Sequence, residues 1–297
     1  MEIIERIGVL TKEISKFREQ DLKVGFVPTM GALHDGHISL IEKARQDCDV
    51  VVVSIFVNPA QFGPEEDLLQ YPRDLGRDSK FCEEKNVDIL FVPSGYEIYP
   101  TNDDALHISF PKYTTRLCGK FRPGHFDGVL LVMTKLLNIV EPDSCFMGKK
   151  DGQQLIIVDK LIKELNLEIE LVGCPTLREA TGLAMSSRNV YLNEEEYGKA
   201  QLINQTLERI STQQLNDIET AIAKEISKLQ DVGLIVQYLE LVDRENLDSV
   251  SKIETGKYML CIAALCGSTR LIDNYFIDID EQGEVKIDRG LRIDSLK

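Results

Sequence analysis

The sequence predicts an α/β fold in which a parallel-sheet domain with flanking helices is followed by a smaller α+β domain. Apolar β-branched runs such as residues 50–57 indicate strands that are covered on both faces. These runs alternate with segments whose apolar residues recur at helical spacing, which is typical of a parallel sheet with helical crossovers. After residue 193 the pattern changes to polar helices and then alternating strands. We therefore expect domains at residues 1–176 and 177–297, with the boundary near 176–190.

The expected elements follow in chain order. The first domain begins with a helix over residues 3–17, strands at 24–27, 50–57 and 87–92, and helices after residue 38 and over 75–84. It continues with a strand at 106–110, a helix at 129–140, a strand at 144–147, a helix through 165 and a strand at 169–172. The second domain contains helices at 194–211 and 215–230, strands at 236–242, 258–265 and 272–277, and a charged tail at 279–297.

The composition is that of an acidic globular protein, with a formal net charge of −15 over 297 residues. Surfaces that bind nucleic acids or anionic membranes are usually basic, so we expect neither partner. Residues 1–7 lack the pattern of a secretory signal, and no apolar run is long enough to span a membrane. Seven scattered cysteines without a C-x-x-C pair indicate neither disulfides nor a zinc site. A soluble, cytoplasmic protein is expected.

The segment VPTMGALHDGH, residues 27–37, lies between a predicted buried strand and an amphipathic helix, so His34 and His37 fall where the helix begins. Free N–H groups and the helix dipole make such a position suitable for a phosphate, and Gly31 and Gly36 allow close approach of a ligand. Simple capping and a metal-binding pair are the alternatives. Since the chain has four histidines and no further metal ligand at a convincing spacing here, we favour a nucleotide phosphate site without a protein-bound metal.

Two loops that follow predicted sheet elements carry polar side chains. In NPAQFG, residues 58–63, Asn58 and Gln61 can both donate and accept hydrogen bonds, which suits a hydroxyl or carboxylate substrate beyond the end of a strand. In RPGHFDG, residues 122–128, Arg122 is followed by glycines, and such loops often close over anionic ligands. A polar turn in the first case and a plain connection in the second are the alternatives.

Two further segments carry cationic groups. GKKDGQQ, residues 148–154, opens a helix after a short strand; a lysine here can contact phosphate, and Asp151 can cap the helix or orient a nucleotide or metal. The alternative is a solvated charged run with a helix cap. MSSRN, residues 185–189, offers hydroxyls and an arginine to phosphate oxygens, although this pattern alone is uninformative.

Together these five segments, in this order, resemble those of the pantoate–β-alanine ligase (pantothenate synthetase) family. The likeness extends from about residue 20 to the end of the chain, where TRLIDN at residues 269–274 also resembles the family, whereas the H-x-G-H pattern alone indicates only the wider nucleotidyltransferase superfamily. The resemblance implies a Rossmann-like domain that binds nucleotide and pantoate, a C-terminal domain that acts as a lid, and a homodimer. It also implies an ATP-dependent ligase that condenses (R)-pantoate with β-alanine through a pantoyl-adenylate, with Mg²⁺, giving pantothenate, AMP and pyrophosphate.

The family resemblance also assigns roles to individual residues. It implies that ATP is bound by Met30, Gly31, Ala32, Leu33, His34, Asp35, Gly36, His37, Gly148, Lys149, Lys150, Asp151, Leu177, Met185, Ser186, Ser187 and Arg188. Gln61 and Gln154 would hold pantoate, Gln61 also approaching β-alanine, and we expect Asn58 and Arg122 to contact substrate as well. The catalytic residues would be His37, as proton donor or phosphate contact, with His34, Lys150, Ser187 and Arg188 neutralising charge on the phosphates.

The sequence departs from the family at Gly152, where an aromatic residue is common, and in the helix 129–140, where Leu-Leu-Val-Met replaces smaller or β-branched residues. Gly152 could loosen the positioning of Gln154. Three other functions remain open: a related H-x-G-H nucleotidyltransferase that leaves a nucleotidyl group on its product, a tRNA-charging enzyme, and a nucleotide-binding regulatory protein without turnover. The net charge of −15 disfavours the tRNA-charging enzyme.

Overall fold

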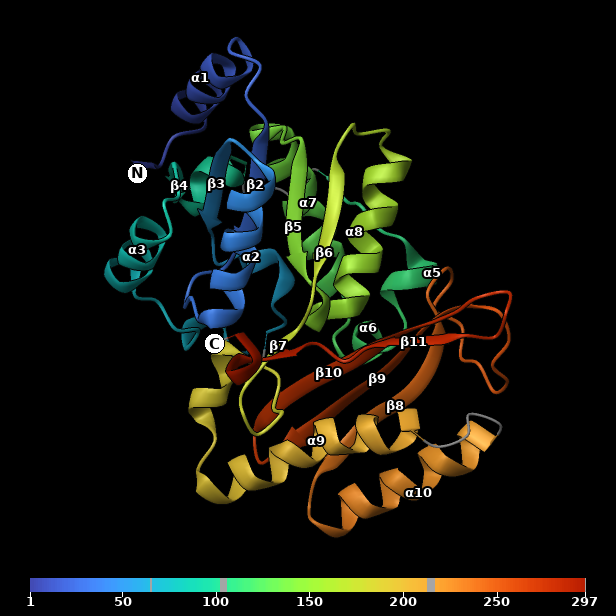
Figure 1. Cartoon of the computed structure of the whole chain (residues 1–297). Helices are drawn as coiled ribbons and strands as arrows, with labels where there is room; N and C mark the ends of the chain where they lie inside the picture. The colour runs from blue at the N-terminus through green and yellow to red at the C-terminus, as the bar shows by residue number, and fades with distance from the viewer. Residues whose placement is uncertain (65, 102–105, 213–216, 297) are drawn as a thin grey trace. The chain divides into compact units, whose positions relative to one another are not determined.

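A computed structural model describes residues 1–64, 66–101, 106–212 and 217–296 of the chain (Figure 1). The chain forms two compact units. The first unit contains Met1–Thr115, Arg122–Gly148 and Ile157–Cys174, and the second contains Arg116–Phe121, Lys149–Ile156 and Pro175–Lys297. The second unit includes two short segments from the middle of the chain, so no single boundary divides the two units. The expected domain boundary between residues 176 and 177 stays a prediction. No helix in the described ranges is long and apolar enough to cross a membrane.

The first unit is built on a six-stranded sheet in which every neighbouring pair runs parallel. The strand order is β1-β4-β3-β2-β5-β6, with β1 Glu2–Ile4, β2 Val24–Thr29, β3 Val50–Ile55, β4 Ile89–Phe91, β5 Ser144–Gly148 and β6 Glu170–Cys174. The order reverses between β2 and β5, because the chain leaves β2 towards β3 and later returns past it to β5. Ligands of open parallel sheets bind beyond the carboxyl ends of the strands at such a switch point.

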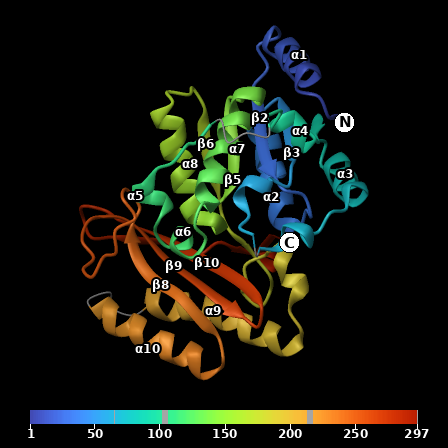
Figure 2. The ribbon, with the colours of Figure 1, turned by 180° about the vertical axis from the view of Figure 1, so that it is seen from behind.

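Helices cover both faces of this sheet (Figures 1 and 2). The crossover through α2 (Asp35–Asp47) and that through α7 (His125–Val140) lead in opposite directions along the sheet. Crossovers between parallel strands are almost always right-handed, and two right-handed crossovers that lead in opposite directions place their helices on opposite faces of a sheet. The other helices of the first unit are α1 Ile7–Arg18, η1 Pro59–Gln61, η2 Asp67–Leu69, α3 Leu75–Glu84, α4 Gly95–Ile98 and α5 Pro111–Thr114. The second unit takes α6 Cys118–Phe121, η3 Lys149–Asp151 and the start of α8 Gly152–Glu164, whose remainder belongs to the first unit.

The core of the first unit consists of the apolar strand residues that the sequence predicted. Val27, Val51 and Phe146 come from three neighbouring strands and are fully buried, and Leu33 and Ile41 pack against them from the turn after β2 and from α2. This core fixes the carboxyl ends of β2, β3 and β5, and with them the first residues of the loops that carry the predicted site.

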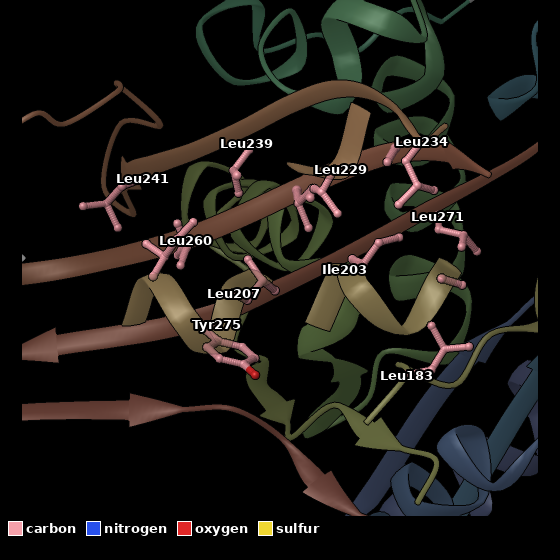
Figure 3. Packing of buried hydrophobic residues seen from close by; sticks show 14 of the residues in the cluster. Leu183, Ile203, Leu207, Leu229, Leu234, Leu239, Leu241, Leu260, Leu271 and Tyr275 are labelled. Carbon is pink, nitrogen blue, oxygen red and sulfur yellow. The ribbon is translucent and has the colours of Figure 1, made fainter. Parts of the chain in front are cut away.

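The second unit packs two helices against a four-stranded antiparallel sheet. The helices are α9 Glu194–Thr212 and α10 Ile218–Asp231, and the sheet order is β11-β10-β9-β8, with β8 Ile235–Asp243, β9 Gly256–Cys266, β10 Thr269–Ile279 and β11 Val285–Asp288. In Figure 3, Leu207 of α9 lies beside Leu260 and Tyr275 of the sheet, and Ile203 lies farther along the same helix, towards Leu271. The expected α/β fold, a parallel-sheet domain followed by a smaller α+β domain, is therefore confirmed.

The predicted first helix is present but starts later than expected, and the strand predicted before α5 was wrong. Residues 2–4 form strand β1, which pairs in parallel with β4, and the first helix begins only at Ile7. Ile3 has the spacing of a residue on the apolar face of the helix, but it is 50% exposed and so does not contribute to a buried face. Residues 106–110 were expected to be a strand and have no regular secondary structure.

Residues 279–297 form the expected charged segment, but two unexpected strands lie within it. β11 extends the antiparallel sheet, and β12 (Leu291–Arg292) pairs in parallel with β7 (Leu177–Arg178). The partner of β12 lies more than 100 residues earlier in the chain, so local patterning gave no signal for this pair. β11 forms a hairpin with β10 directly before it, and its mix of charged and apolar residues lacks a clear strand pattern. A short helix, η6 Ile293–Leu296, follows β12.

Candidate active site

The turn between β2 and α2 contains two consecutive left-handed residues, Gly31 with φ 80° and Ala32 with φ 50°. Three backbone N–H groups of this turn have partners. Gly31 donates to Oγ1 of Thr29 at 3.1 Å, while Ala32 and Leu33 donate to the two carboxylate oxygens of Asp78 at 2.9 and 2.8 Å. Hydrogen bonds from β2 and α3 therefore define the shape of the turn before the helix starts.

His34 and His37 form a reciprocal cap at the start of α2. Gly36 N–H donates to Nδ1 of His34 at 3.1 Å, His34 N–H donates to Nδ1 of His37 at 3.4 Å, and the two ring centroids are 4.2 Å apart. A neutral imidazole whose Nδ1 accepts a hydrogen bond carries its proton on Nε2. Both rings are thus able to donate from Nε2, which suits phosphate oxygens.

Asn58 connects Gln61 to the surrounding backbone. Its Oδ1 accepts from Ala60 N–H at 3.2 Å and from the Tyr99 hydroxyl at 2.7 Å, and its Nδ2 donates to the Gly128 carbonyl at 3.1 Å and to Oε1 of Gln61 at 3.0 Å. The Ala60 N–H can only donate and the Gly128 carbonyl can only accept, so they fix both ends of the Asn58 amide. Gln61 must then turn its oxygen towards Asn58 and its NH₂ group away from it.

The NH₂ group of Gln61 lies 3.2 Å from Sδ of Met30, a residue of the turn after β2. A thioether is a weak acceptor, so a stronger one can displace it. The Asn58 side chain is 1% exposed and uses both ends of its amide within the protein. Its predicted contact with substrate stays a prediction.

Arg122 is connected to the backbone of Gln61 by hydrogen bonds through His125. Its Nε and Nη2 donate to the two carboxylate oxygens of Glu66 at 2.7 and 2.6 Å, and Nη1 lies 3.0 Å from Nε2 of His125. Nδ1 of His125 in turn lies 2.8 Å from the Gln61 carbonyl. Burial raises the pKa of Glu66, but the hydrogen bonds and charge of Arg122 outweigh it and hold that pKa below its usual value. The predicted substrate contact of Arg122 stays a prediction.

The two lysines of the GKKD segment differ in how closely a carboxylate holds them. Nζ of Lys149 forms an ion pair with Asp288 at 2.6 Å, whereas Nζ of Lys150 lies 4.0 Å from the Asp151 carboxylate. Nδ2 of Asn274 donates to the carbonyl oxygens of Lys149 and Lys150 at 3.0 and 2.7 Å. Because Lys149 is held by Asp288, Lys150 is the better placed of the two to meet a phosphate.

Gly152 lies against strands β9 and β10 with no space for a side chain. A Cβ at this position would lie 2.5 Å from Sδ of Met259 and 3.1 Å from Nδ2 of Asn274. Met259 thus occupies the volume into which a side chain at residue 152 would begin to grow. Of the two glutamines that follow, Gln153 is buried and bonded to the backbone of Arg116 and Cys118, while Gln154 is half-buried.

The segment 185–188 is anchored to β7 on one side. Met185 N–H donates to the Leu177 carbonyl at 3.0 Å, and Oγ of Ser186 accepts from the Arg188 N–H at 3.2 Å as the cap of η4 (Ser187–Tyr191). Leu177 is buried, whereas Ser187 and Arg188 are half-buried. The hydroxyl and guanidinium that the sequence singled out therefore come from a short, capped helix.

Several polar residues that hold the predicted site residues in place were not identified from the sequence, namely Asp78, Tyr99, Asn274, and the buried pair of Arg178 with Asp273. Arg178 donates to both carboxylate oxygens of Asp273 at 2.6 and 2.8 Å, next to Asn274. The TRLIDN segment resembled the family but had no assigned role. In the structure its Asp273 pairs with Arg178, and its Asn274 holds the backbone of Lys149 and Lys150. Asp78 left a weaker signal, a carboxylate on the same helical face as the apolar Cys82.

No group of three or more histidine, cysteine, aspartate or glutamate side chains suitable for a metal ion occurs among the residues that the structure describes. An ion that accompanies a nucleotide does not need such a group, because Mg²⁺ usually keeps several waters and is held by substrate phosphates and one or two carboxylates.

Comparisons with known proteins agree with the resemblance. The family model described as pantoate-beta-alanine ligase matches residues 2–276. A pantothenate synthetase of Clostridium botulinum (strain ATCC 19397 / Type A) is 46% identical over 282 residues, covering 93% of this chain and 99% of the relative. One of Thermotoga petrophila is 46% identical over 280 residues, covering 92% of this chain and 99% of the relative.

Solved structures give the same result. The crystal structure of pantothenate synthetase from Thermus thermophilus has a TM-score of 0.81 and 36% identity, with 92% of this chain and 98% of that chain covered. Pantoate-beta-alanine ligase from Francisella tularensis, complexed with beta-gamma ATP and beta-alanine, has a TM-score of 0.77 and 36% identity, with 92% and 97% covered. The chain therefore belongs to the pantoate–β-alanine ligase family, whose known activity is an ATP-dependent ligation.

Proposed function

We propose that this chain joins the carboxylate of (R)-pantoate to the amine of β-alanine through a pantoyl-adenylate, giving pantothenate, AMP and pyrophosphate. The observation that carries the proposal is the turn after β2, where two histidines able to donate from Nε2 cap the start of a helix. A free carboxylate is a poor acylating agent at neutral pH. Its attack on the α-phosphate of ATP releases pyrophosphate and gives an acyl group with AMP as leaving group, which the amine of β-alanine then displaces.

The turn and the first helical turn after it, residues 30–37, are assigned to ATP. N–H groups at a helix start and the positive end of the dipole favour phosphate, and the Nε2 atoms of His34 and His37 can donate to its oxygens. His37 acts as proton donor or phosphate contact. Removing one preorganised donor from a developing charge typically costs about 100- to 1000-fold in rate, so these rings are expected to matter more for adenylate formation than for folding.

Residues of the second half of the family pattern are assigned to the same nucleotide, namely Gly148, Lys149, Lys150, Asp151, Leu177, Met185, Ser186, Ser187 and Arg188. Among them Lys150, Ser187 and Arg188 are proposed to neutralise charge on the phosphates during transfer. The ion pair of Lys149 with Asp288 supports Lys150 rather than Lys149 in this role. Lys149 then contributes through its backbone and by holding the segment in place.

Gln61 and Gln154 are assigned to pantoate, and Gln61 also to β-alanine. Because Asn58 orients the Gln61 amide, Gln61 offers its NH₂ group, which matches a carboxylate or hydroxyl oxygen of the acid. Holding adenylate and amine together in a site shielded from water lowers the barrier through orientation, in favourable cases by about 7 kcal/mol or more.

Mg²⁺ is proposed to enter with ATP and to neutralise phosphate charge, with the phosphate oxygens and water as its main ligands and Asp151 as a candidate protein ligand. A homodimer, a lid role for the C-terminal domain and a cytoplasmic location are proposed from the family resemblance.

The test is incubation of the full chain with ATP, Mg²⁺, pantoate and β-alanine, and with each omitted in turn, followed by AMP, pyrophosphate and amide formation. A ligase releases pyrophosphate with ATP and pantoate alone, and free AMP plus pantothenate only with β-alanine. A product that keeps a nucleotidyl group would instead identify another H-x-G-H nucleotidyltransferase. ATP binding without pyrophosphate release would identify a regulatory protein.

A further inference from the structure

Asp78 buries its carboxylate behind the turn that precedes α2. The residue belongs to the first half of α3 and is 2% exposed, and its Oδ2 and Oδ1 accept the N–H groups of Ala32 and Leu33 at 2.9 and 2.8 Å. A buried carboxylate is costly unless it is paired or well hydrogen-bonded, and here each oxygen takes one backbone donor of the same turn. Both hydrogen bonds lead to the turn and to no other part of the chain.

The turn needs this support because its backbone conformation is unfavourable. Gly31 has φ 80° and Ala32 has φ 50°. The left-handed region is unfavourable for an alanine because its Cβ comes too close to the backbone carbonyl oxygen. A conformation of this kind persists only where the surroundings over-determine it. Thr29 supplies one bond from the strand, and Asp78 supplies two from another helix.

We propose that Asp78 is a positioning residue for ATP, which holds the β2–α2 turn in the shape that places His34 and His37 at the helix start. The proposal rests on the assignment of residues 30–37 to ATP in the proposed function. Asp78 acts through the backbone of Ala32 and Leu33 and takes no part in the chemical steps. Its negative charge is itself unfavourable next to a polyanion, so the contribution to binding must come from geometry.

The chemistry of the carboxylate is specific to this task. Asparagine at this position would offer one acceptor oxygen and would turn an NH₂ group towards the second N–H of the turn, leaving one buried donor unpaired. Glutamate keeps both oxygens but places them one methylene further from α3. Asp78→Asn therefore removes the paired contact at almost constant volume, and Asp78→Glu tests whether the carboxylate is what counts.

The experiment measures ATP and pantoate dissociation constants by calorimetry for the full chain and its variants, together with kcat and KM. For Asp78→Asn we expect ATP binding to weaken by about tenfold or more, which corresponds to the loss of one hydrogen bond to a charged group. Pantoate binding should change by less than about twofold. The KM for ATP should rise more than the KM for pantoate. Asp78→Glu should recover part of the affinity for ATP.

The matched control is Asp74→Ala, which removes the cap of the same helix. Oδ1 of Asp74 accepts the Arg77 N–H at 3.0 Å, so this variant weakens α3 without losing a hydrogen bond to the turn. We expect a lower melting temperature and ATP affinity within about twofold of the parent chain, since a cap affects mainly the stability of its helix. If Asp74→Ala weakens ATP binding as much as Asp78→Asn at equal melting temperature, the role of Asp78 is merely structural and the proposal is overturned.

Hydrogen exchange gives a readout that does not depend on activity. The amides of Ala32 and Leu33 should exchange faster in Asp78→Asn than in the parent chain, and their exchange should be unchanged in Asp74→Ala. Unchanged exchange at both amides in Asp78→Asn would overturn the proposal even if that variant bound ATP poorly. A parent chain that binds ATP but makes no pantothenate would contradict the proposed function and leave the comparison of the two variants fully interpretable.

Discussion

Nδ2 of Asn58 donates to Oε1 of Gln61 across 3.0 Å, and this one bond determines that Gln61 offers an NH₂ group rather than an oxygen. The orientation follows from fixed backbone groups, because the amide of Asn58 is pinned at both ends by Ala60 N–H and the Gly128 carbonyl. Tyr99 adds a third contact, its hydroxyl donating to Oδ1 of Asn58 at 2.7 Å. Burial raises the pKa of the Tyr99 hydroxyl, so it is protonated and able to donate at neutral pH.

Tyr99→Phe should weaken pantoate binding without changing ATP binding. The variant removes one of the bonds that hold the Asn58 amide and, through it, the Gln61 amide. Loss of one buried hydrogen bond is worth about 1 kcal/mol, so we expect the KM for pantoate to rise about three- to tenfold, with the KM for ATP within about twofold. Steady-state kinetics with each substrate varied separately measures both. Tyr96→Phe, whose ring is 74% exposed, is the matched control and should behave as the parent chain.

His37→Ala should cut adenylate formation while the fold persists. The ring accepts a hydrogen bond from His34 N–H at 3.4 Å, a long distance that predicts a small contribution to stability. Loss of a phosphate-facing donor should lower the rate of pyrophosphate release by about 100-fold or more. The rate is measured with ATP and pantoate in the absence of β-alanine. Unchanged pyrophosphate release in a folded variant would remove His37 from the reaction.

The sequence predicted the parts of this protein whose causes are local. The β-branched run at 50–57 and the turn after residue 29 are defined by neighbours in the chain, so β3 and the helix start were found where they were expected. Asp78 meets Ala32 across 46 positions and Asn274 meets Lys150 across 124, and no periodicity reports such contacts. The residues proposed to meet a ligand could therefore be suggested by motif, whereas those that hold them in place could not.

Glu225 makes the stability of the second unit depend on pH. Its carboxylate is 1% exposed between Arg209 and Lys228 on α9 and α10. Burial raises its pKa, but the hydrogen bonds and charges of those two cations outweigh it, so the pKa is lower in the folded protein than the usual 4.5. The folded protein thus binds this proton less readily than the unfolded chain, and the stabilisation is complete above the usual pKa and is lost as pH falls through the lowered one.

Thermal unfolding of the parent chain and of Glu225→Gln between about pH 3 and 7 measures this effect, which begins below the usual carboxyl pKa of 4.5. We expect the parent chain to be the more stable at pH 7 and the difference to shrink on acidification below that value. A difference that stayed constant over this range would mean that charge on Glu225 is unimportant. Glu219→Gln, in the exposed first turn of α10, serves as the control and should show no such convergence.

Gly152→Ala should destabilise the second unit, and Met259 should be the reason. The added Cβ would lie 2.5 Å from Sδ of Met259, so that side chain or the backbone of η3 and α8 must move. Overpacking of this kind typically costs about 1–3 kcal/mol, which urea unfolding can measure. Gly198→Ala is the opposite case, because its position in α9 has open space around it, and it should stabilise by about 0.5–1 kcal/mol.

A double-mutant cycle with Met259→Ala isolates the contact. If Met259 fills the volume that a side chain at residue 152 would need, Gly152→Ala should cost less in the Met259→Ala background, with a coupling of about 0.5–3 kcal/mol. Additive effects would mean that the side chain of Asn274, rather than Met259, opposes the new side chain. The cycle also bears on Gln154, which follows Gly152 by two positions on α8: the KM for pantoate should change in Gly152→Ala and return towards the parent value in the double variant.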